Sequence, residues 1–263
     1  LGDVYKRQIE KGENSKMENG INLIMPMGGK GSRFTKEGFQ VPKPLIRIKD
    51  KPFFYWATQS IRKYIKLKSL TFVVLQEHID KFSIDKEILN YFPEAKIEII
   101  QEVLNGAVLT CIEGVKNIKN HNPIIFNDCD HLFLCSSFND YCNSCEFTKL
   151  DGGLLTFKSD DPKFSYLQCD INGNVIKTVE KEVVSNDAIC GAYYFKNKDL
   201  FIEAAKKYLE TCNYSEYFVS GVYNVMAENG YIIKNFDVDY HLPFGTPSEY
   251  EEAIKSDKFE VLK

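Results

Sequence analysis

The sequence contains no long hydrophobic run. None of its apolar segments approaches the roughly 18 residues that a membrane-spanning helix needs. It also lacks, near its first residues, the apolar segment that marks a protein for export. We therefore expect no membrane partner, and we expect a protein of the cytoplasm.

An excess of basic charge is missing as well. The chain has 33 lysine and arginine residues against 37 aspartate and glutamate residues, which gives a formal net charge of -4. Such a chain presents no overall positive field to nucleic acid, although a local group of basic side chains could still bind phosphates. We expect a small anionic substrate rather than a polymer.

Cysteine is scattered rather than dense. The eight cysteines in 263 residues do not form the closely spaced framework of a small secreted domain, so we expect reduced and mostly buried thiols. Cys142 and Cys145 are the one tight pair. No second pair of Cys or His residues stands at metal spacing, so we do not expect a zinc site.

Apolar segments of strand length recur along the chain, and helical patterns separate the first four of them. We expect strands at residues 21–27, 70–76, 96–101, 123–128, 152–158 and 191–196. We expect helices at residues 52–65, 79–91, 107–118, 198–210 and 217–230. The alternation predicts an α/β fold with a parallel sheet.

Beyond Asp151 the order changes to strands joined by short turns. Asn172-Gly173 is a hairpin signal, and a last strand is expected at residues 231–239. Because no linker, repeat or low-complexity segment separates the halves, we predict one domain over residues 17–263. Residues 1–16 are polar and unpatterned, and we expect a disordered tail or a remnant foreign to the fold.

A glycine-rich loop, "GGKGSRF", follows the first predicted strand. Glycines there let backbone N–H groups form a nest for phosphate oxygens. The loop is not a P-loop, because Lys30-Gly31-Ser32 inverts the required ending, and Phe34 excludes a dinucleotide fingerprint. A tight strand-to-helix turn with an incidental arginine remains the alternative for the loop alone.

The segment "VPKPL" follows soon after the loop, and its two prolines restrict the backbone on both sides of Lys43. A lysine held in this way is typical of a positioned charge. Arg33 in the loop and Lys43 could flank a polyphosphate, since arginine offers a planar fork and lysine a compact point charge.

These two motifs resemble the signatures of the nucleotidyltransferase family of sugar-phosphate pyrophosphorylases. The similarity runs from about Ile21 to Glu252, and "DGGLLTFKSDDPKFSY", "VEK", "SEYFVSGVYN" and "FGTPSEYEE" resemble a bacterial subgroup linked to surface polysaccharide genes. The resemblance implies a Rossmann-like three-layer α/β/α fold with a mostly parallel central sheet, related to that of GT-A glycosyltransferases. It also implies a nucleotide-binding half at about 21–150 and an acceptor-binding half at about 151–255.

The family's reaction is metal-dependent: a sugar 1-phosphate attacks the α-phosphorus of a nucleoside triphosphate, which releases pyrophosphate and leaves a nucleotide sugar. The resemblance implies that Arg33 acts on the leaving pyrophosphate and that Lys43 contacts the phosphates near the reacting centre. Gln101 would contact the base. The identity of the base stays open, because Asn105 stands where many relatives have glutamine. The implied nucleotide-binding residues are Met27, Gly28, Gly29, Gly31, Ser32, Gln101, Asn105, Gly106 and Asp128.

Carboxylates gather in "IIFNDCDHLF", at the end of an expected buried strand, where sites of α/β proteins form. Asp130 matches the family position that binds Mg²⁺, and Asp128 could assist or only cap the loop. Pro243 stands where many relatives have a second metal carboxylate. Asp239, or less well Asp237, could replace it, and a surface turn is the equal alternative.

The same resemblance assigns Glu180, Lys181 and Glu216 to the acceptor. The attacking phosphate oxygen is already anionic, so no general base is required, and His131 is not expected to act as one. Catalysis would instead depend on positioning and on charge neutralisation.

Three other functions stay open at this point. Cytidylyl transfer could use a non-sugar phosphomonoester such as phosphocholine or a phosphorylated amide like phosphoglutamine. Asp128-Cys129-Asp130 also matches the D-x-D motif of metal-dependent glycosyltransferases. Pro243 and Asn105 would suit a nucleotide-binding regulator without catalysis. The sequence leaves the oligomeric state open, a homo-oligomer included.

Overall fold

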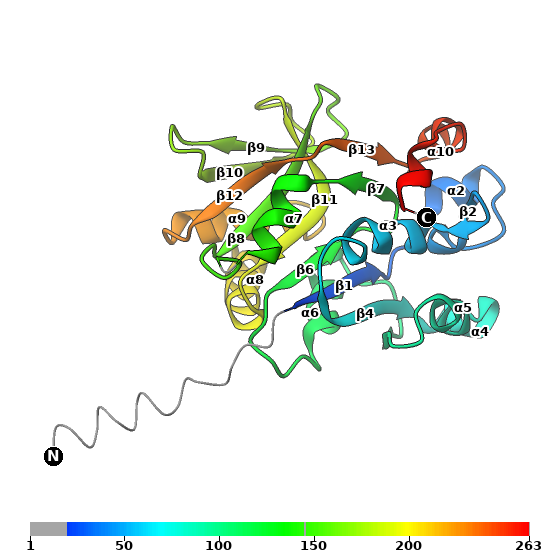
Figure 1. Ribbon diagram of the computed structural model, residues 1–263. Coiled ribbons are helices and arrows are strands. Elements are labelled where there is room, and N and C mark those ends of the chain that lie inside the picture. The colour runs from blue at the N-terminus through cyan, green and yellow to red at the C-terminus, as the bar shows by residue number, and fades with distance from the viewer. Residues whose placement is uncertain (1–19, 145, 263) are drawn as a thin grey trace, which may run out of the picture.

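A computed structural model describes residues 20–144 and 146–262 of the chain (Figure 1). Residues 1–16 and Cys145, on which two of the predictions above depend, lie outside the described residues. Within the described part, Cys111, Cys129, Cys135, Cys142 and Cys190 are buried free thiols. In the same part, no helix is both long and apolar enough to cross a membrane.

Strands from both halves of the chain form one sheet. Nine strands belong to it, in the order β10-β9-β11-β6-β1-β4-β5, with β8 paired to β11 and to β12. The strands of the described residues are β1 (Ile21–Met27), β2 (Arg47–Ile48), β3 (Lys51–Pro52), β4 (Leu67–Leu75), β5 (Lys96–Ile100), β6 (Ile124–Asn127), β7 (His131–Leu134), β8 (Gly152–Lys158), β9 (Ser165–Cys169), β10 (Val175–Glu180), β11 (Asp187–Phe195), β12 (Ile233–Asp237) and β13 (Tyr240–Pro243).

Helices connect these strands and cover both faces of the sheet (Figure 1). They are α2 (Ser32–Lys36), α3 (Phe53–Arg62), α4 (Gln76–Phe82), α5 (Ile84–Tyr91), α6 (Ala107–Val115), α7 (Ser136–Asn143), α8 (Lys198–Thr211), α9 (Val219–Glu228) and α10 (Pro247–Ala253), with short 3₁₀ helices η1 (Lys43–Leu45) and η2 (Lys258–Leu262). Helices from distant parts of the chain pack together on each face of the sheet.

The side chains of β1 show why the fold has three layers. Successive residues of a strand point to opposite faces. Leu23 and Met25 belong to the buried cluster that includes residues of α3, α5 and α7. Ile24 belongs to the cluster on the other face, which includes residues of α6, α8 and α9. This arrangement confirms the predicted three-layer α/β/α fold.

The central strands β5, β4, β1 and β6 are mutually parallel. Their carboxyl ends therefore meet at one edge of the sheet, which is where α/β proteins place their sites. Beyond β6 the sheet is mixed, because β11 runs antiparallel to β6, β8 and β9, while β12 runs parallel to β8.

Most predicted elements are present with shifted ends, and one helix is divided. The segment predicted as a single helix over 79–91 contains the end of α4 and all of α5, because Ser83 adopts left-handed dihedrals with φ 51°. The predicted hairpin is confirmed: β9 and β10 pair antiparallel, and Gly173 at their turn has φ 72°. Two of the turn's N–H groups, those of Asn172 and Asn174, donate to Asp170.

A third cluster of buried side chains packs the carboxyl-terminal segment of the chain against α2 and α3. Phe244 and Phe259 pack there with Phe53 and Trp56 of α3. The indole N–H of Trp56 donates to the carbonyl of Ile48 at 2.9 Å. This packing holds the segment after β13 next to the sheet edge that carries the site.

Candidate active site

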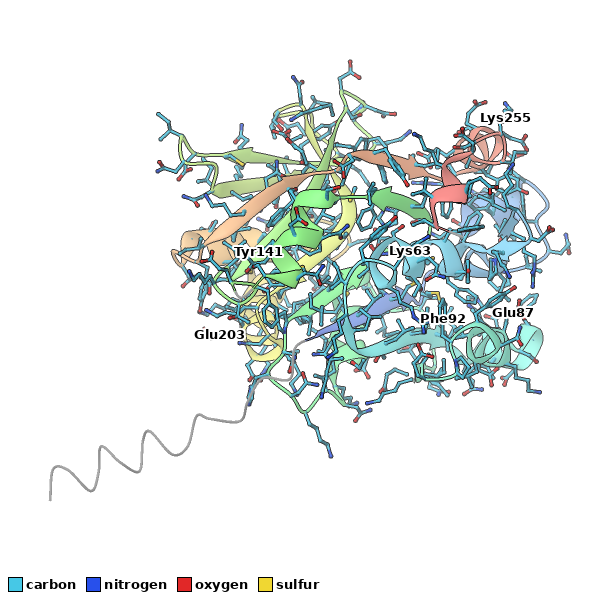
Figure 2. All side chains as sticks on the ribbon, viewed as in Figure 1. Lys63, Glu87, Phe92, Tyr141, Glu203 and Lys255 are labelled. Carbon is cyan, nitrogen blue, oxygen red and sulfur yellow. The ribbon has the colours of Figure 1, made fainter. Side chains whose placement is uncertain are left out.

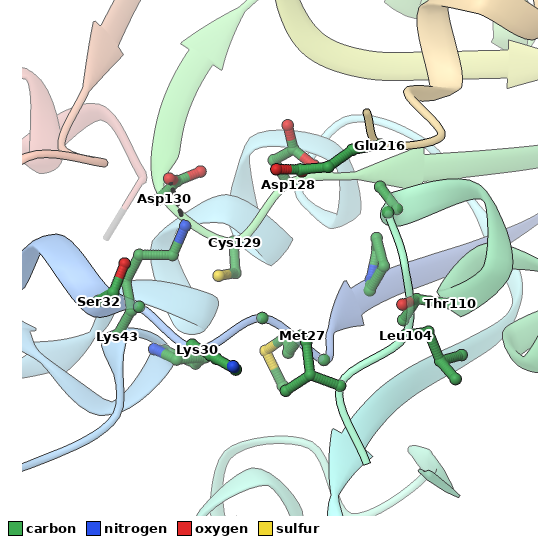
Figure 3. Close-up of a pocket in the computed structure, with 18 of the residues that line it drawn as sticks. Met27, Lys30, Ser32, Lys43, Leu104, Thr110, Asp128, Cys129, Asp130 and Glu216 are labelled. Atoms are coloured by element: carbon green, nitrogen blue, oxygen red, sulfur yellow. Dashed lines mark hydrogen bonds and ion pairs between the residues drawn. The ribbon is translucent and has the colours of Figure 1, made fainter. Parts of the chain in front are cut away.

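The glycine loop runs from the end of β1 to the start of α2 and forms one wall of a cavity of about 550 Å³ (Figure 3). Gly28 is packed against the protein, because a Cβ atom there would lie 2.5 Å from Ile100 Cδ1. Gly29 has no atom within 4 Å of that position and faces open space. Gly31 has φ 60°, which starts α2 in a conformation that favours glycine.

Lys43 lies directly against this loop, since a Cβ atom on Gly31 would be 3.0 Å from Lys43 Cβ. Its Nζ atom forms an ion pair of 2.7 Å with Asp130 Oδ2, drawn as a dashed line in Figure 3. Burial acts to lower the pKa of Lys43, but the charge and hydrogen bond of Asp130, together with the nearby Cys129 and Asp128, outweigh it and raise the pKa above its ordinary value. Burial acts to raise the pKa of Asp130, and the Lys43 ammonium outweighs it and lowers that pKa.

Asp128 lies on the loop that follows β6, in the wall of the same cavity. Burial raises its pKa to about 7, the charge of Asp130 adds to the effect, and Lys43 partly opposes it. Its N–H donates to the carbonyl of Gly191 at 2.9 Å. Gly191 has φ 96°, and a Cβ atom there would lie 2.6 Å from Asp128 Oδ2, so only glycine leaves this carboxylate in place.

The segment after β13 packs on Asp130. The N–H of Phe244 donates to the Asp130 carbonyl at 2.9 Å, and a Cβ atom on Gly245 would lie 2.3 Å from Asp130 Oδ2. The antiparallel pair of β7 and β13 sets this register, with His131 opposite Pro243. Pro243, which stands where many relatives have a metal carboxylate, therefore lies beside Asp130 and supplies no carboxylate there.

Asp239 lies at the other end of the β7 and β13 pair, where its N–H donates to the carbonyl of Leu134 at 2.7 Å. Its Oδ2 accepts hydrogen bonds from both N–H and Oγ of Ser136, each at 2.7 Å. Asp239 thus binds the first residue of α7 and is not brought to Asp130. The expectation that it completes a metal site has no support from its position, because the length of the strand pair separates the two carboxylates.

A second cavity of about 200 Å³ adjoins the first, and Asp128 and Asp130 line both. Arg33 lines this smaller cavity and not the larger one. Lys163 and Glu249 also line it and form an ion pair of 3.1 Å. The two aspartates therefore stand at the junction of two binding spaces.

Sequence reasoning missed Lys163 and Glu249. The spacing of Thr246 and Glu249 is that of a capping box, which the structure contains at the start of α10. That signal could have predicted the helix, but it carries no information about Lys163, whose approach depends on the loop between β8 and β9.

The buried His131 and the half-buried His241 border the smaller cavity. Asn127 donates its amide N–H to Ala57, so its Oδ1 accepts from His131 Nε2 at 3.1 Å. His131 Nδ1 is then the acceptor for His241 Nε2 at 3.2 Å. Burial lowers the pKa of His131 to about 4 and lowers that of His241. Both nitrogens of the neutral His131 ring are therefore in hydrogen bonds, whereas Nδ1 of His241 is buried without a partner among the described residues.

The loop after β5 and the segment before α9 are joined by backbone contacts. The N–H of Val108 donates to the carbonyl of Tyr217 at 3.1 Å, and the N–H of Tyr217 donates to the carbonyl of Asn105 at 3.4 Å. Gly106 has φ 100°, and a Cβ atom there would lie 2.3 Å from Tyr217 N. This contact places Glu216 in the wall of the larger cavity, although the sequence assigned it to the acceptor.

The structure brings most of the predicted site residues together. The larger cavity is lined, among others, by Met27, Gly28, Gly29, Gly31, Ser32, Lys43, Asn105, Gly106, Asp128, Asp130 and Glu216. Gln101 is exposed directly after β5 and lines neither of the two cavities. Its predicted contact with the base stays a prediction.

Glu180 and Lys181 also lie outside the walls of both cavities. The carboxylate of Glu180 accepts hydrogen bonds from Ser220 and from Ser165, the second at 2.6 Å, and Ser165 lines the smaller cavity. The Lys181 ammonium lies 5.2 Å from the centre of the Phe218 ring. Their predicted role toward the acceptor stays a prediction.

The donor set at the junction fits a cation that needs few protein ligands. Among the described residues, no group of three or more His, Cys, Asp or Glu side chains could hold a metal ion. Asp128 and Asp130 offer carboxylate oxygens beside the space for phosphates. One or two carboxylates, completed by substrate phosphates and water, are what Mg²⁺ usually takes.

The fold has three layers, and the carboxyl edge of its sheet carries a glycine loop, a positioned lysine and two aspartates. This combination defines a nucleotide-dependent enzyme. The profile of the nucleotidyl transferase family matches residues 21–258, and the chain belongs to this family. It is a nucleotidyltransferase of the pyrophosphorylase type.

One curated relative is a sugar-phosphate enzyme by its name. The chain is 26% identical over 244 residues to the D-glycero-α-D-manno-heptose 1-phosphate guanylyltransferase of Campylobacter jejuni. The alignment covers 88% of this chain and 97% of that protein.

Solved structures share the fold at lower identity. The nucleoside-diphosphate-sugar pyrophosphorylase of Vibrio cholerae has a TM-score of 0.78 at 20% identity and covers 89% of this chain and 100% of its own. The inositol-1-phosphate CTP transferase of T. maritima has a TM-score of 0.71 at 17% identity and covers 92% and 94%. These likenesses confirm the predicted fold.

Proposed function

We propose that the protein transfers a nucleoside monophosphate from a nucleoside triphosphate to a sugar 1-phosphate and releases pyrophosphate. The observation that carries the proposal is the junction of two cavities at Asp128 and Asp130. The larger one has a glycine loop and Lys43 for a triphosphate. The smaller one has Arg33 and Lys163, which suit a second phosphorylated substrate.

Catalysis in this site depends on bringing two anions together. The N–H groups of the glycine loop and the ammonium of Lys43 would hold the triphosphate, while Arg33 and Lys163 would neutralise charge from the adjoining cavity. The attacking phosphate oxygen needs no deprotonation, which agrees with a His131 ring whose two nitrogens are both held in hydrogen bonds. Positioning and charge neutralisation are then the main contributions.

We propose Mg²⁺ as the cofactor, held by Asp130 and Asp128. A bound Mg²⁺ ion supplies positive charge to the phosphate oxygens during the transfer. Lys43 is bound to one oxygen of Asp130, so the other oxygen of this carboxylate and those of Asp128 are the protein's contribution. Asp239 is left out of this set because it binds α7.

The sugar acceptor rests on the relatives. The Campylobacter jejuni relative is a heptose 1-phosphate enzyme by its name, and the Vibrio cholerae neighbour is a nucleoside-diphosphate-sugar pyrophosphorylase. With the resemblance to a surface-polysaccharide subgroup, they support a role in nucleotide-sugar supply for such polymers. The cytoplasm, where nucleoside triphosphates are made, is the compartment that suits this chemistry.

A pyrophosphate-release screen tests the proposal. Four nucleoside triphosphates are each combined with a set of sugar 1-phosphates and a set of small phosphomonoesters, phosphocholine included, with and without Mg²⁺. We expect pyrophosphate from at least one sugar 1-phosphate, only with the metal, and little from the Asp130→Ala variant.

Other outcomes would replace the proposal. Turnover with non-sugar phosphomonoesters alone would make the protein a transferase of another acceptor class. Nucleotide binding without turnover for any pair would indicate a regulator. Sugar transfer from a finished nucleotide sugar, without pyrophosphate, would indicate a glycosyltransferase.

A further inference from the structure

The larger cavity is polarised along its length. Ser32 and Lys43 lie at one end of it, while Leu104 and Thr110 lie at the opposite end (Figure 3). Phosphates belong at the end with the ammonium and the glycine loop. A flat nucleobase belongs at the end with the apolar side chains. Because ribose joins the base to the phosphates, the ribose must lie between these two ends.

Glu216 lines the wall beside this middle part. In the view of Figure 3 it lies on the side of the cavity opposite Lys30 and Met27. A carboxylate repels phosphates, so a binding role for Glu216 requires a group that donates hydrogen bonds. The hydroxyls of ribose are such donors at this place in the cavity.

The position of Glu216 is set by the loop after β5, which also lines the cavity. The two backbone hydrogen bonds between Tyr217 and residues 105 and 108 tie the segments together, and Gly106 allows their close approach. The backbone that carries Glu216 therefore keeps a defined place relative to Asn105.

The acceptor capacity of this carboxylate is unused within the described residues, where Glu216 makes no side-chain hydrogen bond and no ion pair. Glu180, by contrast, is occupied by two serine hydroxyls. Glu216 is an exposed side chain in the cavity, ready to accept from a ligand.

We propose that Glu216 accepts hydrogen bonds from the ribose hydroxyls of the nucleoside triphosphate and thereby selects ribonucleotides over 2′-deoxyribonucleotides. The inference rests on the proposed function, since it requires that the larger cavity bind the triphosphate. Carboxylates bind ribose hydroxyls in this way in dinucleotide-binding folds, so the chemistry is a known solution.

Equilibrium binding without an acceptor tests this inference. Isothermal titration calorimetry measures the dissociation constants of ATP, CTP, GTP and UTP, and then of the 2′-deoxy form of whichever binds most tightly, with and without Mg²⁺. The proteins are the full chain, Glu216→Ala, Glu216→Gln and, as a matched control on the exposed end of α8, Glu210→Gln.

We expect the unmodified chain to bind the ribonucleotide at least about tenfold more tightly than its 2′-deoxy form, since a lost hydrogen bond to a charged group has about this effect. Glu216→Ala should bind both forms equally. Glu216→Gln, which keeps one acceptor oxygen, should show intermediate selectivity, and Glu210→Gln should match the unmodified chain. The selectivity should persist without Mg²⁺, which separates this role from a metal ligand.

Several results would overturn the inference. Equal binding of both forms by the unmodified chain, or selectivity that survives in Glu216→Ala, would exclude a ribose contact. A change in the preference among the four bases with unchanged ribose selectivity would move Glu216 to the base. If no triphosphate binds at all, the proposed function itself fails, and this inference with it.

Discussion

The ammonium of Lys43 lies 2.7 Å from the carboxylate of Asp130, and this ion pair joins two segments that are 87 residues apart in the chain. Both side chains are mostly covered, with 27% of the Lys43 side chain and 21% of the Asp130 side chain accessible, and both reach the cavities. Figure 2 shows the side chains of the described residues on the ribbon. The pair places one positive and one negative charge where the two proposed substrates would meet.

Removal of either partner should reduce turnover with little effect on folding. We expect Lys43→Ala and Asp130→Ala each to lower kcat/KM at least about a hundredfold, because positioned charges at a phosphoryl-type transfer have effects of this size. Lys36→Ala, at the exposed end of α2, is the matched control and should keep full activity. Steady-state kinetics and circular dichroism check both statements, and near-normal turnover of Asp130→Ala would exclude its role.

Ionisation of Asp128 should lower the free energy of unfolding as the pH rises. Its folded pKa of about 7 lies above its value of about 3.9 in an unfolded chain, so the folded state binds the proton more tightly. The contribution favours folding at low pH and is lost as the pH rises to 7. Asp128→Asn should therefore gain stability over the unmodified protein between pH 4 and 7, by up to about 1.4 kcal/mol per pH unit. Urea unfolding with a chelator present measures it, and a constant difference between pH 5 and 8 would contradict the shift.

Asp239 should contribute to stability rather than to metal binding. Because it accepts two hydrogen bonds from Ser136 at the start of α7, Asp239→Ala should lower the free energy of unfolding by about 1 kcal/mol. The Mg²⁺ concentration for half-maximal turnover should not change. A shift of that concentration would restore Asp239 as a metal ligand, and Asp130→Ala serves as the comparison in which the metal response changes.

Two neighbouring glycines of the loop should differ in what they contribute. Gly28→Ala forces a Cβ atom against Ile100 and Thr110, so we expect a loss of about 1 to 3 kcal/mol in stability. Gly29→Ala has free space around its Cβ atom and should fold normally, but it should weaken triphosphate binding by narrowing the phosphate nest. Thermal unfolding and calorimetric binding separate the two, and normal binding by Gly29→Ala would place the phosphates elsewhere.

Arg33 should affect the transfer step more than nucleotide binding. The family resemblance assigns it to the leaving pyrophosphate, whereas its place in the smaller cavity, which lacks the glycine loop and Lys43, puts it on the side of the proposed acceptor. Arg33→Ala should lower kcat while the dissociation constant of the triphosphate changes little. If binding alone suffers, the arginine only helps to hold the triphosphate.

Elements formed by neighbouring residues could be predicted from the sequence. The apolar run of β1, the glycine loop after it, the constrained Lys43 and the turn at Gly173 all depend on patterns within a few residues. The break at Ser83 could not be predicted in this way, because the segment reads as one helix and no glycine or proline marks the change.

The sequence by itself determined the α/β class, the glycine loop, the lysine and the aspartates of the candidate site, because each is a local pattern with its own chemistry. Only the tertiary structure decided which of them meet. Asp239 binds α7, and Glu216 lines the larger cavity. The physical reason is that these contacts come from the register of a strand pair and from backbone hydrogen bonds between distant segments, neither of which leaves a mark in the residues nearby.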